Sequence, residues 1–134
     1  MAVIKIDHIG IVVRDIEAAL KVYRDALGLE LARVESVPEQ AVRIACLPTG
    51  EGEIELVQPT TDDSGIARYL ARRGEGIHHI CLEVDDLESS LAHMAAQGIE
   101  LIDETPRTGS AGQRYAFIHP KSTQGVLIEL YERG

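Results

Sequence analysis

The sequence predicts an α+β fold in which two paired βαβββ modules form a curved eight-stranded mixed sheet around a metal-containing cavity. The first observation is a repeated strand: "KIDHIGIVV" at residues 5–13 returns as "GIHHICLEV" at residues 76–84. The second is that a segment with helical spacing of its apolar residues follows each copy. The third is the tripeptide "IEL", which closes the copies at residues 54–56 and 128–130. Together they indicate an internal repeat.

We expect a single domain over residues 1–134. Module one takes about residues 3–60, a linker helix about residues 61–75, and module two about residues 76–132. One module of this size cannot bury the apolar face of its strands alone, and pairing two copies solves this. The helices can then cover one face of the combined sheet and leave the other face to curve around a cavity.

Each module helix has a start signal and a stop signal. Asp15 and Asp86 stand where an aspartate side chain caps a helix N-terminus. Gly28 and Gly98 stand where a glycine ends a helix. Each helix is therefore expected to run between its aspartate and its glycine.

Apolar runs bounded by turn residues predict three strands after each of these helices. In module one they lie at about residues 29–36, 41–47 and 53–57. In module two they lie at about residues 99–102, 115–118 and 126–131. Between the modules, "DDSGIARYLARRGEG" predicts a linker helix over about residues 64–73.

Composition excludes several classes of protein. A net charge of −9 argues against nonspecific binding of nucleic acid. No apolar run approaches the roughly 20 residues of a membrane span, and the N-terminal residues lack the pattern of a signal peptide. Cys46 and Cys81 lie in separate apolar runs, which fits a reducing compartment better than a disulfide scaffold. We expect a cytoplasmic protein with no nucleic-acid or membrane partner.

Four polar residues occupy equivalent positions in the two copies. His8 and His79 fall into register within the repeated strand, and Glu55 and Glu129 lie at the centre of the repeated tripeptide. Because side chains alternate along a strand, a pseudo-twofold axis would bring all four to equivalent inward positions. The alternative is that the histidines are core or surface residues and the glutamates solvated strand positions. The neighbouring His78 is interpreted as structural.

Two imidazoles and two carboxylates suit one divalent ion per chain, such as Co, Zn, Ni or Mn. Without thiolate ligands, the site does not resemble a closed structural zinc site. Four protein ligands leave a six-coordinate ion two open positions, through which a substrate can chelate with two neighbouring oxygens. The ion would then act as a Lewis acid on an enolate.

Four segments resemble the vicinal-oxygen-chelate superfamily, and more closely its methylmalonyl-CoA epimerases: "IDHIGIVV", "EGIHHICLEVDD", "GIELIDETPRTGSAG" and "FIHPKSTQGVLIELYE". The last two are the most specific, and the resemblance covers almost the whole chain. It implies that His8, Glu55, His79 and Glu129 are metal ligands. It also implies interconversion of (2R)- and (2S)-methylmalonyl-CoA.

The sequence departs from this pattern at a proposed catalytic base. Some epimerases carry a glutamine at the position of Glu55, and a glutamate thought to be a base where this chain has Ile44. A base at that position is therefore absent here. Epimerisation needs a general base on each face of C2, and Glu55 and Glu129 are the candidates that this sequence offers.

Substrate contacts are expected from two loops. In "PRTGSAGQRYAF", Gly109 and Gly112 surround a flexible turn, and Arg107 flanks it. The loop can bind a substrate carboxylate. The alternative is a plain hairpin loop with solvated charges. In "HPKSTQG", Lys121 and Ser122 can contact the phosphates of CoA or form a polar turn. We expect an acyl-CoA substrate.

Two other functions are open at this point. A glyoxalase-like lyase or a dioxygenase would still be an enzyme of the same superfamily. An extradiol dioxygenase would need an iron site of two histidines and one carboxylate, and the four candidate ligands of this sequence argue against it. A non-enzymatic small-molecule binding protein can keep the paired modules, but it does not need the set of histidines and glutamates. The superfamily resemblance and the apolar surface around the N-terminal strand also predict a homodimer.

Overall fold

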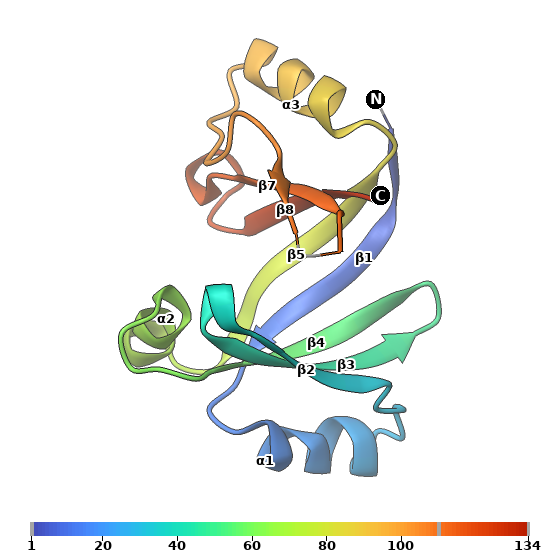
Figure 1. Cartoon of the computed structure of the whole chain (residues 1–134), viewed down its shortest axis with the longest axis vertical. Helices are drawn as coiled ribbons and strands as arrows, with labels where there is room; N and C mark the ends of the chain where they lie inside the picture. Colours follow the sequence, from blue (N-terminus) through green and yellow to red (C-terminus); the bar gives the residue numbers. More distant parts are fainter. Residues whose placement is uncertain (1, 110, 134) are drawn as a thin grey trace. The chain divides into compact units, whose positions relative to one another are not determined.

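The computed structural model describes residues 2–109 and 111–133. In these residues the strands are β1 (Val3–Val12), β2 (Arg33–Val37), β3 (Val42–Thr49), β4 (Gly52–Pro59), β5 (Gly76–Val84), β6 (Arg107–Thr108), β7 (Arg114–Ile118) and β8 (Leu127–Glu132). The helices are α1 (Ile16–Leu20), the π-helix η1 (Lys21–Ala26), the 3-10 helix η2 (Pro38–Gln40), α2 (Gly65–Arg73), α3 (Leu87–Ala96) and the 3-10 helix η3 (Pro120–Ser122) (Figure 1).

The strands are hydrogen-bonded in the order β2-β3-β4-β1-β5-β8-β7-β6. β5 pairs with β8 in parallel. The β2–β3, β3–β4, β6–β7 and β7–β8 pairs are antiparallel. The predicted α+β fold with an eight-stranded mixed sheet is therefore confirmed.

The chain divides into two compact units. Unit 1 contains Met1–His8 together with His79–Gly134, and unit 2 contains Ile9–His78. β1 and β5 therefore contribute residues to both units. The assignment of residues 1–134 to a single domain remains a prediction.

In unit 2, α1 packs on the strands through a compact apolar cluster. Its fully or nearly fully buried members are Val13, Ile16, Leu20, Ala45, Leu47 and Leu56. The predicted cap is confirmed, because the Asp15 side chain accepts a hydrogen bond from the backbone N–H of Glu17. The Ile16 N–H donates to Oε1 of Gln58 at 2.8 Å, which joins the start of the helix to the end of β4.

The helix of unit 2 continues as a π-helix, which accommodates one extra residue. Gly28 follows its capping aspartate Asp15 by thirteen positions, whereas Gly98 follows Asp86 by twelve. The Leu27 N–H bonds to the carbonyl of Val22, five residues back, at 2.8 Å. A π-type turn adds one residue within a helix without ending it.

Unit 1 repeats the arrangement with α3. The buried cluster contains Val84, Leu87, Leu91, Ala116, Ile118 and Leu130. Asp86 caps the helix by accepting from Ser89 N–H, and the Leu87 N–H donates to Oε1 of Glu132 at 2.7 Å. Glu132 thus takes in unit 1 the role that Gln58 takes in unit 2. Gly98 follows the helix with φ +81°, as a terminating glycine should.

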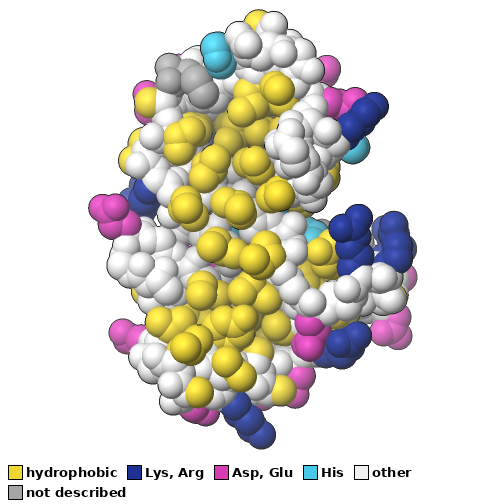
Figure 2. Space-filling view, turned by 180° about the vertical axis from the view of Figure 1, so that it is seen from behind, with side chains coloured by type: hydrophobic (Ala, Val, Ile, Leu, Met, Phe, Trp, Pro, Cys, Tyr) yellow, Lys and Arg dark blue, Asp and Glu magenta, His cyan; other side chains and the backbone are white. Residues whose placement is uncertain are grey.

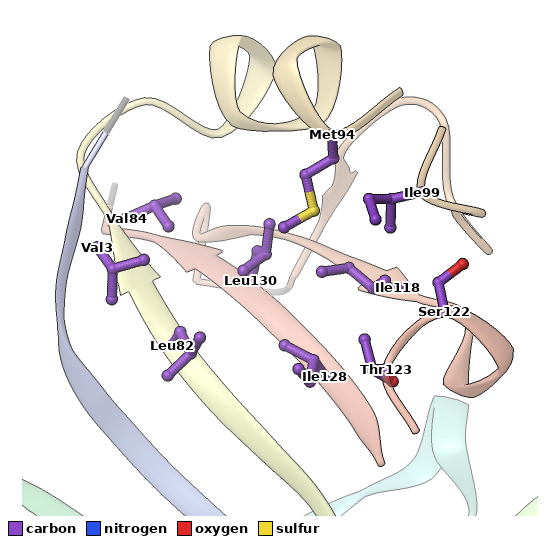
Figure 3. Close-up of a pocket in the computed structure, with 10 residues that line it drawn as sticks. All are labelled: Val3, Leu82, Val84, Met94, Ile99, Ile118, Ser122, Thr123, Ile128 and Leu130. Atoms are coloured by element: carbon purple, nitrogen blue, oxygen red, sulfur yellow. The ribbon is translucent and has the colours of Figure 1, made fainter. Parts of the chain in front are cut away.

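A small apolar cavity of about 120 Å³ lies in unit 1 between α3 and the strands. Figure 3 shows Met94 and Ile99 reaching toward Leu130 and Ile118 across it. Ser122 and Thr123 close one end. The cavity marks the side of these strands that packs against α3.

Two predicted strands are corrected. The strand expected at residues 99–102 is reduced to a single bridge between Leu101 and Ile118. The reason is that the N–H groups of Ile102 and Asp103 both bond to the carbonyl of Phe117, at 3.0 and 3.2 Å, so regular pairing stops there. The first strand after η1 begins at Arg33 rather than near residue 29, because Leu29 and Leu31 pack against the apolar cluster of unit 2.

The linker helix was predicted at about residues 64–73 and is observed as α2, with Ser64 as its N-cap. None of the helices in the described part of the chain is long and apolar enough to cross a membrane.

Candidate metal centre

Three of the predicted ligands converge in unit 1: His8 from β1, His79 from β5 and Glu129 from β8. The Nε2 atoms of the two histidines are 3.0 Å apart. Oε1 of Glu129 lies 3.6 Å from each of them. The three side chains are only 11–15% exposed. Two imidazole nitrogens and one carboxylate oxygen therefore meet around one point in a largely buried place.

Strand alternation explains why these side chains meet. Leu130 belongs to the apolar cluster under α3, so Glu129 points to the opposite side of β8. Leu82 and Val84 also pack into that cluster, so His79 points away from it on β5. The parallel register of β5 and β8 places His79 beside Leu127, two residues from Glu129. The glutamate is therefore a diagonal neighbour of His79 on the same face.

The donor set fits a divalent ion. Ligand atoms about 2.1 Å from an ion and about 90° apart are separated by about 3 Å, which is the separation of the two Nε2 atoms. Neutral imidazole and carboxylate suit Zn, Co, Ni or Mn. The imidazole rings meet edge to face, with their centroids 5.1 Å apart, and their Nε2 atoms face one another.

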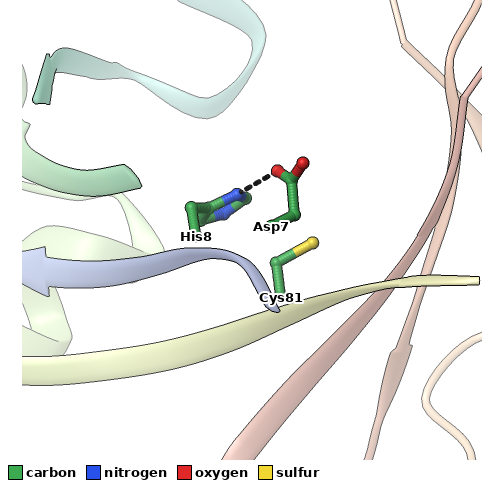
Figure 4. A group of neighbouring side chains, drawn as sticks. All are labelled: Asp7, His8 and Cys81. Carbon is green, nitrogen blue, oxygen red and sulfur yellow. Dashed lines mark hydrogen bonds and ion pairs between the residues drawn. The ribbon is translucent and has the colours of Figure 1, made fainter. Parts of the chain in front are cut away.

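Asp7 and Cys81 surround the other side of the His8 ring (Figure 4). Nδ1 of His8 lies 2.8 Å from Oδ2 of Asp7. This hydrogen bond holds the pKa of Asp7 below its ordinary value. Burial raises the pKa of the Cys81 thiol to about 12, so the sulfur is protonated at neutral pH rather than the thiolate that binds metals. Asp7, His8 and Cys81 are thus a weaker candidate ligand group than the histidine pair with Glu129.

Glu55 belongs to unit 2, where it lies on β4 directly opposite Cys46 of β3. Glu53, Glu55 and Cys46 form a third cluster with ligand atoms within 4.8 Å of one another. Burial raises the pKa of Cys46 to about 12, and the charges of Glu55 and Glu53 add to this effect. The role of Glu55 as a fourth ligand remains a prediction.

His78, the neighbour of His79, has different surroundings. Its ring meets the ring of Tyr69 edge to face, with centroids 4.7 Å apart. Burial lowers the pKa of His78. The two adjacent histidines therefore differ in their contacts, as strand alternation predicts.

The predicted substrate loop around Gly109 is held by the chain itself. Nε of Arg107 donates to Oδ1 of Asp103 at 2.8 Å, while Oδ2 of Asp103 accepts from the Phe117 N–H at 2.9 Å. The amide of Gln113 lies over Gly109 where a Cβ would stand, so a larger residue at this position would displace that side chain. Gly112 has a φ of +83°, which also favours glycine. Residue 110 lies outside the described residues.

Lys121 and Ser122 lie in η3, a tight turn before β8. The Lys121 N–H donates to Nδ1 of His119 at 3.0 Å, and Oγ of Ser122 accepts from the Glu100 N–H at 2.9 Å. Ser122 also lines the apolar cavity under α3. Its hydroxyl therefore has a structural partner, whereas the Lys121 side chain is exposed.

Sequence reasoning missed Asp7 as a member of the site. Regular alternation places Asp7 on the face of β1 opposite to His8. The observed hydrogen bond between these consecutive residues is a local departure from that rule. The only signal was the adjacency of an aspartate to the candidate ligand.

Comparisons with known proteins find a matching family model and similar relatives. The family model of the Glyoxalase/Bleomycin resistance protein/Dioxygenase superfamily matches residues 7–117. An ethylmalonyl-CoA/methylmalonyl-CoA epimerase from Cereibacter sphaeroides is 34% identical over 128 residues, which cover 94% of this chain and 96% of that protein.

Solved structures are similar over nearly the whole chain. A methylmalonyl-CoA epimerase in complex with methylmalonyl-CoA and NH4+ has a TM-score of 0.90 and 37% identity, with 99% of this chain and 96% of that one covered. A variant of the Streptomyces coelicolor methylmalonyl-CoA epimerase in complex with 2-nitronate-propionyl-CoA has the same TM-score of 0.90, 37% identity and the same coverage of 99% and 96%.

Proposed function

Because the chain belongs to the Glyoxalase/Bleomycin resistance protein/Dioxygenase superfamily and, within it, to the family of methylmalonyl-CoA epimerases, we propose that it interconverts (2R)- and (2S)-methylmalonyl-CoA with a bound divalent metal ion. The observation that carries the proposal is the convergence of His8, His79 and Glu129 in unit 1. The acyl-CoA substrate is supported by the relatives whose names include methylmalonyl-CoA.

The reaction requires a proton to leave C2 from one face and return to the other. C2 lies between a thioester and a carboxylate, so removal of the proton gives an enolate. A divalent ion held by His8, His79, Glu129 and the predicted fourth ligand Glu55 would supply Lewis-acid stabilisation of the developing negative charge. The ligand of the Streptomyces coelicolor relative supports this chemistry, because a nitronate is a planar anion like an enolate.

We assign proton transfer to Glu129 and Glu55, one for each face of C2. Glu129 belongs to the histidine cluster of unit 1, and a carboxylate has two oxygens, so one can hold the ion while the other handles a proton. Glu55 occupies the equivalent position in the other copy of the repeat. Ile44 has no acid–base group, which leaves the two glutamates as the candidates.

The Gly109 loop and η3 are assigned to substrate binding. Asp103 binds Nε of Arg107, yet the Arg107 side chain is 54% exposed, which supports an ionic contact with a substrate carboxylate. Gly109 and Gly112 are assigned to the same subsite as residues that shape the loop, since their own N–H groups donate to the carbonyls of Gln113 and Gly109 at 2.8 and 3.0 Å. The exposed Lys121, with Ser122 beside it, is assigned to the phosphates of CoA.

We also propose a homodimer in the cytoplasm. Ile4 and Ile6 near the start of β1 share one face of the strand and are 56% and 52% exposed, which leaves apolar surface for a partner to cover. Figure 2 shows apolar side chains exposed over one face of the molecule. The two free, buried cysteines are compatible with a reducing compartment.

Proton exchange by glutamate variants tests the assignment of the bases. In heavy water, Glu55→Gln and Glu129→Gln should each fail to epimerise, because epimerisation needs both faces. Each variant should still exchange the C2 proton of one stereoisomer with solvent. The stereoisomer that exchanges should be the (2R) form in one variant and the (2S) form in the other. Glu39→Gln, which changes an exposed glutamate of η2, is the matched control and should behave as wild type. Epimerisation by Glu55→Gln at near wild-type rate would reduce Glu55 to a ligand only.

A further inference from the structure

We propose that Asp7 is a positioning residue that fixes the tautomer of His8 so that its Nε2 atom faces the metal centre. The inference deepens the proposed function, since it concerns the same histidine. It is carried by the contact between Nδ1 of His8 and Oδ2 of Asp7, at 2.8 Å.

The direction of this hydrogen bond follows from the chemistry of the two groups. An ionised carboxylate can only accept hydrogen bonds, so Nδ1 of His8 must carry the proton. In a neutral imidazole the other nitrogen is then an acceptor with a lone pair. That nitrogen is Nε2 of His8, which lies 3.0 Å from Nε2 of His79 and 3.6 Å from Oε1 of Glu129. The carboxylate therefore leaves the metal-binding lone pair on the correct atom.

The same constraint sets the direction of the contact between the two histidines. When His8 is neutral with its proton on Nδ1, its Nε2 is an acceptor and the 3.0 Å contact is donated by Nε2–H of His79 in the metal-free protein. The two histidines thus have opposite tautomers before metal binds. This gives two independent signals for a measurement.

An acidic residue directly before the candidate ligand histidine occurs in one copy of the repeat only. The residue before His79 is His78, and its ring packs on Tyr69. The residue before His8 is the aspartate. Partners that orient a ligating histidine in this way affect metal affinity by about 10–100-fold. We therefore expect the effect of Asp7 to be specific to His8.

The first experiment measures tautomers by long-range 1H–15N correlation spectra of the metal-free protein. We expect wild-type His8 to carry its proton on Nδ1 and His79 to carry its proton on Nε2. In Asp7→Ala, the His8 signals should shift toward the Nε2–H form. In Asp7→Asn they should stay, because the amide oxygen can still accept. A wild-type His8 with its proton on Nε2 would overturn the proposal, whether or not any variant folds.

The second experiment measures zinc affinity by competition with a chromophoric chelator. Asp7→Ala should bind zinc about 10–100-fold more weakly, and Asp7→Asn within a few fold of wild type. Asp25→Ala is the matched control, because it removes an exposed aspartate that pairs with Arg24 away from His8, and it should retain both tautomer and affinity. If Asp7→Ala binds zinc as tightly as the wild type and the tautomer of His8 is unchanged, the proposed role of Asp7 is contradicted. Absence of zinc binding in the wild type would instead refute the metal centre, while the tautomer spectra would still decide the role of Asp7.

Discussion

His8 and His79 point their Nε2 atoms at one another, and Glu129 lies 3.6 Å from both. These three largely buried groups contact one another. A divalent ion at their centre would take one ligand atom from each of them. The adjacent His78 offers a direct comparison, since it has the same chemistry with its ring against Tyr69.

We expect His79→Ala and His8→Ala each to lose most of the bound metal and most of the activity, because each removes one nitrogen ligand. His78→Ala should keep both. The checks are metal content by mass spectrometry after refilling with Co or Zn, and the rate of epimerisation. Loss of metal in His78→Ala with retention in His79→Ala would mean that the strand register is off by one.

The two thiols are expected to resist modification. Cys46 and Cys81 are fully buried, and burial raises the pKa of each to about 12 from an ordinary value of 9.0. A thiol reagent at pH 8 should therefore modify neither in the folded protein and both after unfolding. Because the folded pKa is raised, the neutral thiols stabilise the fold below about pH 9, and this contribution is lost between about pH 9 and 12. Rapid modification of either thiol at pH 8 without unfolding would contradict their burial.

At this scale the sequence predicted the convergence of four residues, of which His8, His79 and Glu129 meet in unit 1, but not how they are supported. Register and alternation were sufficient for His8, His79 and Glu129, because both rules act along single strands. Asp7 was missed because its contact breaks the alternation rule locally. The contact of the Gln113 side chain with Gly109 was missed, because side chains in a loop do not alternate regularly as they do in a strand.

At the scale of elements, the two module helices begin alike and continue differently. Both start at a capping aspartate, and both receive a side-chain acceptor from the last strand of their module, Gln58 or Glu132. The π-helix η1 takes up the single extra residue before Gly28. The longer spacing from Asp15 to Gly28 than from Asp86 to Gly98 reveals the extra residue in the sequence, but the pattern of apolar residues does not show that a π-type turn accommodates it.

Removing the cap of α3 should destabilise the protein. Asp86→Ala loses the acceptor for Ser89 N–H, which typically costs about 1 kcal/mol in the free energy of unfolding. His93→Ala changes an exposed residue of the same helix and is the control. It should alter the free energy of unfolding by less than about 0.5 kcal/mol. Urea unfolding measures both. Equal stability of Asp86→Ala and wild type would show that the cap contributes nothing.

The short strands of module two were the least predictable elements. Residues 99–102 have the apolar content of a strand, but two successive N–H groups bond to the single carbonyl of Phe117. The two-residue β6 forms instead next to the loop of Gly109. Both outcomes depend on tertiary hydrogen bonds, which local sequence does not encode.

At the scale of the whole molecule, the duplicated sequence predicted the duplicated architecture, since each copy folds into a helix packed on strands. The compact units do not follow the repeat boundaries, because Met1–His8 joins the unit of His79–Gly134. This exchange brings His8 into the same unit as His79 and Glu129. A boundary drawn from sequence similarity alone cannot show it.

The exposed apolar residues of β1 should mediate dimerisation. We expect a dimeric mass by light scattering at micromolar concentration, and a lower mass for Ile4→Glu, which places a charge on a side chain that is 56% exposed. Val22→Glu, a change at an exposed apolar residue of η1, should leave the mass unchanged. A monomeric mass for the wild type would refute the dimer.

The most direct test of the central claim follows the C2 proton of (2S)-methylmalonyl-CoA in heavy water, by mass spectrometry and chiral analysis. With Co or Zn restored, the wild-type protein should incorporate deuterium at C2 and produce the (2R) form. After chelation of the metal both signals should fall to background, and they should return when the ion is added back. Full exchange and epimerisation by the metal-stripped protein, or neither with any divalent ion, would contradict a metal-dependent epimerase built on His8, His79 and Glu129.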